Sequence, residues 1–282
     1  MKIGMQLRVG PRNWVSYAQA AEQAGFESIW MPEHLIMPVK MSGKPGSAHE
    51  GEPPISGETP AWDPWLQIAY LAGQTSTIRF GTNVFNIGLR HPFITARALM
   101  TADLISNGRV EFGIGASWLA EEWQAMELPF ETRGRRVNES IRIIQQLFTQ
   151  DVVEHQGEFF NFQPVSFMPK PVQAPWPPFH IGGDSIPAMR RAVQLGDGWM
   201  PMAQTPDTLA GSLAKLAQLR EEAGRERPLQ VTIYNIEPVS AEDLQRYRDM
   251  GVDRVLVVPQ GHPRDGVDWI RRFGDQVLPA FA

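Results

Sequence analysis

An acid and a histidine stand next to each other early in the chain, at Glu33 and His34, directly after the apolar segment 28–32. Histidine titrates near neutral pH and a neighbouring carboxylate can tune it, so such a pair can move protons during a reaction. The alternative is that the acid caps a helix and the imidazole bonds only to loop backbone. We predict that Glu33 and His34 are catalytic, because side chains that follow a strand of an α/β barrel are well placed for chemistry.

Glycines and a hydroxyl lie in front of a helical segment later in the chain, at Gly182, Gly183 and Ser185. The first backbone amides of a helix have no partner inside it, so together with a hydroxyl they can bind an anion such as phosphate. Arg190 and Arg191 follow within two turns, and they could either support that anion or lie in solvent. From these residues alone, both interpretations stay open.

Two more segments could contribute to a binding site. Residues 81–88 place Asn83, Val84 and Asn86 after an apolar stretch. Small and polar residues there are typical of a bulge or bend at a site, although the asparagines could simply cap turns. Residues 113–118 are rich in glycine and end in Trp118, but they lack the third glycine of a dinucleotide-binding loop. Close approach to a ligand and tight packing are both compatible with these glycines.

The elements that must carry these residues alternate between strands and helices. We expect strands at residues 2–7, 28–32, 78–84, 110–114, 179–181, 198–200, 229–234 and 254–258. We expect helices at residues 14–24, 64–76, 92–106, 119–126, 136–149, 186–195, 208–223, 241–250 and 267–277. Residues 152–168 alternate around a glycine and predict a hairpin outside this series. Eight strands, each followed by a helix, predict an α/β fold, a TIM (β/α)8 barrel, in one domain spanning residues 1–282.

The composition excludes several classes of protein. With 26 basic and 31 acidic residues the net charge is −5, so neither nucleic acid nor an anionic membrane is expected as a partner. The absence of cysteine excludes disulfides, thiolate metal sites and a thiol nucleophile. The six histidines show no metal-ligand spacing, so we expect no metal. No signal peptide or membrane-spanning segment stands out, which predicts a soluble cytoplasmic protein.

Short motifs in a fixed order connect the chain to a known family. Between Lys2 and about Gly224 they are AGFESIW (24–30), PEH (32–34), DP (63–64), RFGTNV (79–84), RHP (90–92), DLISNGR (103–109), GIGASW (113–118), EE (121–122), PWPP (175–178), IGG (181–183) and GDGWMP (196–201). Each motif is weak by itself, whereas the ordered set at matching spacing is specific. The sequence therefore resembles the luciferase-like monooxygenase superfamily and, within it, the oxidoreductases that depend on coenzyme F420, a deazaflavin.

The resemblance implies a barrel whose mouth, at the carboxyl ends of the strands, holds the tricyclic ring of the cofactor. It implies that Glu33 and His34 lie beside this ring, with His34 giving or taking a proton. It also implies a non-proline cis peptide bond at Asn83-Val84 that supports the ring from behind, with Asn86 as a further contact. The segment 37–60 would overlie the mouth as an insertion.

The resemblance also assigns the rest of the cofactor site. It implies that Gly182, Gly183 and Ser185 bind the cofactor phosphate. Trp118, which stands where some sugar-oxidising relatives carry an acid, is expected to contact the cofactor but cannot act as a base. Oxidation of a sugar alcohol through that position is therefore not expected.

The expected activity is hydride transfer between the deazaflavin ring and a small organic substrate. Two other functions stay open. An FMN-dependent monooxygenase supplied by a separate flavin reductase would show the same motifs, because FMN shares the tricyclic ring and the ribityl phosphate. A non-catalytic flavin-binding barrel would show them as well. A homodimer is compatible with the resemblance, because members of the family are often dimers.

Overall fold

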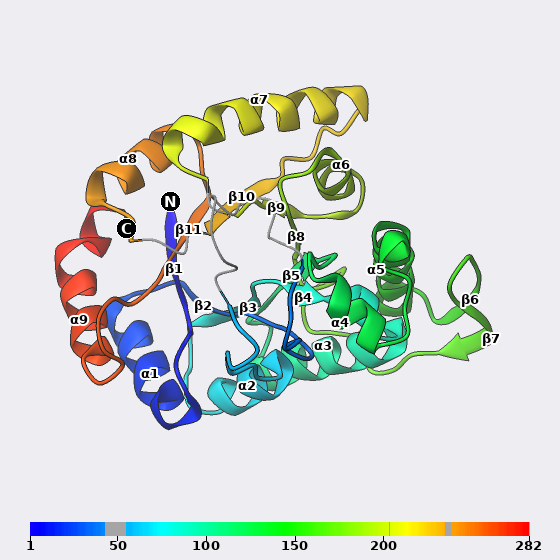
Figure 1. The fold of residues 1–282 in the computed structure, drawn as a ribbon, viewed down its shortest axis with the longest axis horizontal. Helices are drawn as coiled ribbons and strands as arrows, with labels where there is room; N and C mark the ends of the chain where they lie inside the picture. Colours follow the sequence, from blue (N-terminus) through cyan, green and yellow to red (C-terminus); the bar gives the residue numbers. More distant parts are fainter. Residues whose placement is uncertain (43–54, 203, 235–237, 282) are drawn as a thin grey trace.

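Parallel strands close into a barrel at the centre of the molecule (Figure 1). The computed structural model of the chain describes residues 1–42, 55–202, 204–234 and 238–281. Within these ranges the barrel strands, in their order around the barrel, are β1 (Lys2–Gln6), β2 (Ser28–Met31), β3 (Arg79–Thr82), β5 (Val110–Gly115), β8 (Phe179–Gly182), β9 (Gly198–Met200), β10 (Gln230–Tyr234) and β11 (Arg254–Val257). Pairing of β11 with β1 closes the ring, so the predicted TIM barrel is confirmed.

The third strand is not continuous, contrary to the expected single strand at residues 78–84. β3 pairs with β2 as far as Thr82, and the amide of Asn83 still donates to the carbonyl of Met31. The chain then changes partner, and the short strand β4 (Phe85–Asn86) pairs with β5 instead. Residues 83–84 lie in the step between the two pairings, which the apolar pattern of the sequence does not reveal.

Helices surround the barrel. They are α1 (Trp14–Ala24), α2 (Pro64–Ala72), α3 (Pro92–Ser106), α4 (Ala120–Ala125), α5 (Arg133–Thr149), α6 (Ile186–Leu195), α7 (Pro206–Glu222), α8 (Ala241–Asp249) and α9 (Gly266–Gln276). Short 3₁₀ turns occupy Pro11–Asn13, Ile87–Leu89, Phe130–Thr132 and Leu278–Ala280. Among the residues that the structure describes, no helix is both long and apolar enough to cross a membrane.

The helix ends follow local signals in most places, and at α2 a contact with a distant residue is added. Asp63 caps α2, because its carboxylate accepts from the amides of Trp65 and Leu66. The helix ends at Ala72 and not at the expected residue 76. The carboxylate of Glu22, on α1, accepts hydrogen bonds from the amides of residues 76–78 and so holds that segment outside the helix. The helix therefore ends before Gly73, and a distant residue holds the chain that follows.

The predicted hairpin is confirmed and lies outside the barrel (Figure 1). β6 (Val152–Gln156) pairs antiparallel with β7 (Asn161–Ser166). Glu139 of α5 anchors the turn between them, because its carboxylate accepts from the amides of Phe159 and Phe160. The same carboxylate lies 3.1 Å from Nε2 of His155.

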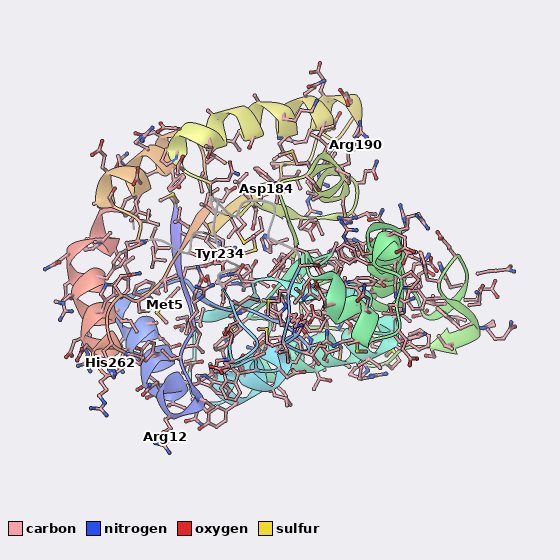
Figure 2. All side chains as sticks on the ribbon, viewed as in Figure 1. Met5, Arg12, Asp184, Arg190, Tyr234 and His262 are labelled. Atoms are coloured by element: carbon pink, nitrogen blue, oxygen red, sulfur yellow. The ribbon has the colours of Figure 1, made fainter. Side chains whose placement is uncertain are left out.

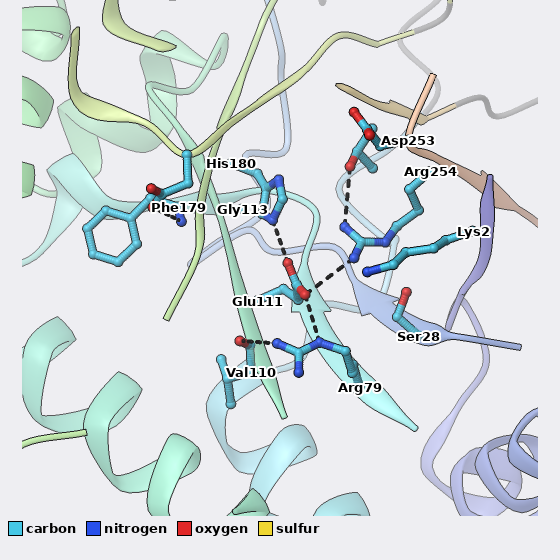
Figure 3. A network of polar contacts seen from close by, with 12 residues as sticks. Lys2, Ser28, Arg79, Val110, Glu111, Gly113, Phe179, His180, Asp253 and Arg254 are labelled. Atoms are coloured by element: carbon cyan, nitrogen blue, oxygen red, sulfur yellow. Dashed lines mark hydrogen bonds and ion pairs between the residues drawn. The ribbon is translucent and has the colours of Figure 1, made fainter. Parts of the chain in front are cut away.

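Charged side chains fill the amino-terminal half of the barrel (Figure 3). Glu111 of β5 is buried and contacts Arg79 Nε at 2.7 Å, His180 Nε2 at 2.5 Å and Arg254 Nη2 at 3.3 Å. Arg254, buried as well, also pairs with Glu27 at 2.8 Å. Burial alone would raise the pKa of Glu111, but the charge of Arg254 and the hydrogen bond from His180 hold it well below its usual range. The carboxylate of Glu111 therefore stays ionised at neutral pH.

The network predicts a loss of stability in Glu111→Gln. The variant leaves the positive charges of Arg79 and Arg254 without their shared carboxylate in the barrel. Breaking a buried charge pair costs about 3–5 kcal/mol, and we expect a loss of this size in the free energy of unfolding at pH 7. Because the carboxyl pKa is lower in the folded chain, the advantage of the wild type should shrink as the pH falls below about 4.3.

Urea denaturation of both proteins between pH 3 and 7 measures this difference. Glu158→Gln is the matched control, because Glu158 pairs with Arg135 on the surface and should leave stability nearly unchanged. Equal losses in the two variants would contradict the assignment.

Candidate active site

Four strand exits meet at the carboxyl end of the barrel. Asn86 pairs with Gly115, which joins the end of β4 to the end of β5. Ile114 pairs with Ile181, which joins β5 to β8. The β2 exit joins them through Glu33, whose carboxylate accepts from the amide of Asn86 at 2.8 Å. The residues predicted for the site from β2, β4, β5 and β8 therefore come from one connected edge of the barrel.

Val84 lies between two glycines at this edge. The Asn83-Val84 peptide bond is cis, as the resemblance implied. A Cβ on Gly115 would come within 2.4 Å of Val84 Cγ2, and one on Gly182 within 2.9 Å of Val84 Cγ1. Both glycines are therefore required by the close approach of this side chain. Val84 also packs against the apolar cluster of Trp30, Met200, Tyr234 and Leu256, which lines the barrel below the mouth.

The carboxamide of Asn83 has no hydrogen-bond partner within the described ranges. The residue is 5% exposed, and both Oδ1 and Nδ2 are buried. A buried polar group without a partner costs about 1–3 kcal/mol, so such groups in folded proteins are usually satisfied by a ligand or water. A flat, polar-edged ring such as a flavin or deazaflavin offers the acceptors and donors that this carboxamide lacks. The predicted cofactor site fits the residues present.

Glu33 is buried and fully engaged with its neighbours. Besides Asn86, it contacts Nη2 of Arg90 at 2.7 Å, and the guanidinium of Arg90 lies 4.3 Å from the ring centroid of Phe85. Burial raises the pKa of Glu33, and the charge of Arg90 limits the rise. These contacts fasten the β2 exit to β4. The geometry gives Glu33 a positioning function, and its predicted catalytic role stays a prediction.

His34 has one ring nitrogen held and one available. Nδ1 lies 3.3 Å from Oε2 of Glu122, and the side chain is 15% exposed. Among the residues that the structure describes, Nε2 has no partner. The ring of Trp118, half-buried after β5, meets the imidazole edge-on at 6.1 Å and 86°. The predicted contact of Trp118 with a cofactor stays a prediction.

Glu122 is a site residue that the sequence did not single out. Its carboxylate is completely buried in the first turn of α4. Oε1 accepts from the amide of Leu35 at 2.6 Å and that of Ile36 at 3.4 Å, and Oε2 faces His34 and the hydroxyl of Ser117. Two adjacent acids at a helix start normally lie in solvent, so only the position of the EE motif after a strand exit could have suggested this role.

The glycine loop after β8 leaves backbone amides for an anion. The amides of residues 184–186 have no partner among the described residues, and Trp199 Nε1 holds the carbonyl of Gly183 at 2.9 Å. The amide of Gly183 itself donates to the carbonyl of Met200. The hydroxyl of Ser185 caps α6 by accepting from the amide of Ala188. Phosphate binding by Gly182, Gly183 and Ser185 stays a prediction, in which the free amides are the available donors.

The two arginines of α6 do not serve this loop. Arg191 is buried and bonds to Asn138 and to the carbonyl of Gly134 on α5, and burial lowers its pKa to about 10. Arg190 is exposed and lies farther from the barrel than Asp184 does (Figure 2). Burial raises the pKa of Asp184 to about 6, so this acid is still mostly ionised at pH 7.

The expected insertion at residues 37–60 is only partly visible. Residues 43–54 lie outside the described residues. At the near side of that gap, Glu121 accepts from the amide of Ser42 at 2.7 Å and from its hydroxyl. The neighbouring acids Glu121 and Glu122 thus hold both ends of the segment 35–42.

A hollow lies at the other, amino-terminal end of the barrel. It measures about 360 Å3 and is lined by residues that precede or begin β8, β9 and β10, including Trp176, Asp197 and Arg227. Active sites of (β/α)8 barrels lie at the carboxyl ends of the strands. This hollow is therefore not a candidate for the catalytic centre.

The contacts of Glu122 predict that Glu122→Ala releases the segment after His34. A hydrogen bond to a charged group contributes about 1.5–3 kcal/mol, so amide hydrogen exchange at Leu35 should become about 10- to 100-fold faster. NMR-detected exchange measures this rate. Glu121→Ala is the control, because it should speed exchange at Ser42 and leave Leu35 unchanged. Unaltered exchange at Leu35 in Glu122→Ala would show that the carboxylate does not hold the segment.

Comparisons with known proteins place this geometry in a family. The family model for luciferase-like monooxygenases matches residues 3–263. An uncharacterized protein of Mycobacterium tuberculosis is 30% identical over 244 residues, which cover 86% of this chain and 84% of that protein. An F420-dependent glucose-6-phosphate dehydrogenase of Amycolatopsis mediterranei is 31% identical over 207 residues, which cover 71% of this chain and 57% of that protein.

A solved structure has the same fold. The coenzyme F420-dependent tetrahydromethanopterin reductase of Methanopyrus kandleri superposes with a TM-score of 0.80 at 18% identity, covering 100% of this chain and 99% of the other. At that identity the likeness shows the fold, whereas the family model covers nearly the whole sequence. The chain therefore belongs to the luciferase-like monooxygenase family.

Proposed function

We propose that the protein is a coenzyme F420-dependent oxidoreductase that transfers a hydride between the deazaflavin ring and a small organic substrate. The observation that carries the proposal is the buried carboxamide of Asn83, without a partner among the described residues, beside Val84 at the meeting point of β4, β5 and β8. The F420-dependent relative supports this choice of cofactor. When bound, the deazaflavin supplies the hydride chemistry, and the protein supplies binding and orientation.

Each part of the mouth has a separate task toward such a cofactor. Val84, wedged between Gly115 and Gly182, supports the ring from below, and Asn83 satisfies its polar edge. The amides of residues 184–186 bind the phosphate at the start of α6. Trp118 covers the edge of the site next to His34.

His34 carries the proton that accompanies hydride transfer. Its Nε2 gives or takes this proton, because Glu122 occupies Nδ1 and fixes the orientation of the ring. A carboxylate behind an imidazole is the usual arrangement for a histidine that must present one nitrogen to a substrate. Glu33, which holds Asn86 and Arg90, keeps the β2 exit in place for this step.

The alternative cofactor is FMN, which shares the ring and the ribityl phosphate. In that case the protein is a monooxygenase that needs a separate flavin reductase. A barrel that binds flavin without turnover is the remaining alternative. We also propose a homodimer, supported by the exposed apolar side chains of Leu66 and Tyr70 on α2 and Ile94 and Ile105 on α3.

Titration of the purified protein with each cofactor distinguishes these functions. We expect F420 to bind at least about tenfold more tightly than FMN, measured by cofactor absorbance and fluorescence. Gly182→Ala should weaken binding by about tenfold or more, because its Cβ meets Val84 Cγ1 at 2.9 Å. Gly211→Ala is the control, because a Cβ there meets nothing within 4 Å. Tighter binding of FMN would favour the monooxygenase.

Removal of the imidazole tests the proton-transfer step. His34→Ala should lower the turnover rate by about 10²-fold, while the dissociation constant of the cofactor changes little. The rate is measured by stopped flow with a substrate found in a panel of alcohols, aldehydes and ketones. His155→Ala, in the outer hairpin, is the control and should turn over normally. An unchanged rate in His34→Ala would eliminate this role for the histidine.

A further inference from the structure

Arg8 projects into the mouth of the barrel from the end of β1. Side chains alternate along a strand, and a Cβ on Gly4 would meet Leu256 and Ser28 inside the barrel. Gly4 and Gln6 therefore face inward, and Arg8 is an exposed residue two positions beyond the end of β1. Nη2 of Arg8 donates to the hydroxyl of Tyr234 at 2.7 Å, across the end of β11. Tyr234 itself lies near the centre of the barrel (Figure 2).

No carboxylate within the described ranges pairs with Arg8. Arg79, Arg90 and Arg254, the other arginines that reach the barrel from its strands and exits, each contact a glutamate at 2.7 or 2.8 Å. Among the described residues, Arg8 interacts instead with Tyr234. It donates a hydrogen bond to the neutral hydroxyl, and its guanidinium carbon lies 5.9 Å from the centroid of the same ring. Its guanidinium is therefore held in place by Tyr234, exposed and without a carboxylate partner among the described residues.

A cavity of about 110 Å3 adjoins this guanidinium, between the chain after β1 and the chain after β11. Its lining contains a single charged residue, Arg8, and its other polar residues are Gln6, Tyr17 and Gln260. A water molecule occupies about 30 Å3 of liquid, so the cavity has room for a carboxylate or phosphate group. The lining chemistry favours an anion.

The position in the barrel separates this cavity from the glycine loop. In the order of strands around the barrel, β1 and β8 lie four strands apart in a ring of eight, on opposite walls. Arg8 nevertheless borders the same mouth, because Tyr234 belongs to the apolar cluster against which Val84 packs. A ring lying on Val84 with its phosphate at β8 would leave Arg8 facing the space for the substrate.

We propose that Arg8 binds an oxyanion of the substrate, a carboxylate or a phosphate, and so selects anionic organic substrates. The proposal rests on the proposed function for its link to catalysis. Arg8 supplies two or more parallel N–H donors, which match the oxygens of either group. Tyr234 holds the guanidinium in position while its ring remains part of the apolar floor.

Inorganic phosphate is the probe for this site. The full chain is titrated with phosphate at constant ionic strength by isothermal calorimetry, as wild type, Arg8→Gln, Arg8→Lys and Arg12→Gln. Arg12 is an exposed arginine at the periphery of the molecule and is the matched control (Figure 2). We expect saturable binding that Arg8→Gln weakens by about tenfold or more, that Arg8→Lys partly retains and that Arg12→Gln leaves unchanged.

The Gly182→Ala variant distinguishes this site from the loop at β8. Phosphate binding that persists in Gly182→Ala and is lost in Arg8→Gln supports the proposal. Binding that persists in Arg8→Gln, or that is not saturable, overturns it. The cofactor titration is independent of this result, because phosphate binding at Arg8 without F420 or FMN binding would remove the proposed function and leave the anion site. Cofactor binding with unchanged phosphate affinity in Arg8→Gln would remove the anion site and leave the proposed function.

Discussion

The close approach of Val84 to two glycines is the constraint on which the mouth of the barrel depends. It brings the ends of β4, β5 and β8 within contact distance, because any side chain at Gly115 or Gly182 would displace Val84. The same approach buries Asn83 behind it without giving its carboxamide a partner among the described residues. A packing requirement thus creates both the support and the unsatisfied polar edge that a flat ligand needs.

Much of the fold could be predicted from the sequence because its signals are local. Asp63 before a proline starts α2, and Gly25 and Asn107 end α1 and α3 in the left-handed conformation. Local signals do not predict contacts between residues that lie far apart in the sequence. α2 ends before Gly73, and Glu22 on α1 accepts from the amides of residues 76–78, a contact that the pattern of residues 64–76 does not reveal.

The candidate site also combines positions that could be predicted from the sequence with contacts that could not. The order of strand exits, with polar or glycine-rich residues after each, was enough to place Glu33, His34, Asn83 and Gly182 along one edge of the barrel. The partners of these residues were not predictable, because a carboxylate in the sequence looks the same whether it is solvated or buried. The roles of three residues become clear only from their contacts in the fold. Glu122 accepts from two backbone amides and faces the imidazole of His34. Arg90 contacts Glu33, and Arg8 donates to the hydroxyl of Tyr234.

Three carboxylates at the mouth are committed to the protein itself. Glu33 holds the amide of Asn86, Glu122 holds the amide of Leu35, and Glu121 holds that of Ser42. Each of these contacts fixes a loop at the mouth of the barrel. Among the described residues of the mouth, the polar groups left for ligands are few and differ in kind: a neutral carboxamide, one imidazole nitrogen, a set of free amides and one unneutralised guanidinium. The acids therefore set the geometry, and in the proposed function these remaining neutral and positive groups bind the ligands.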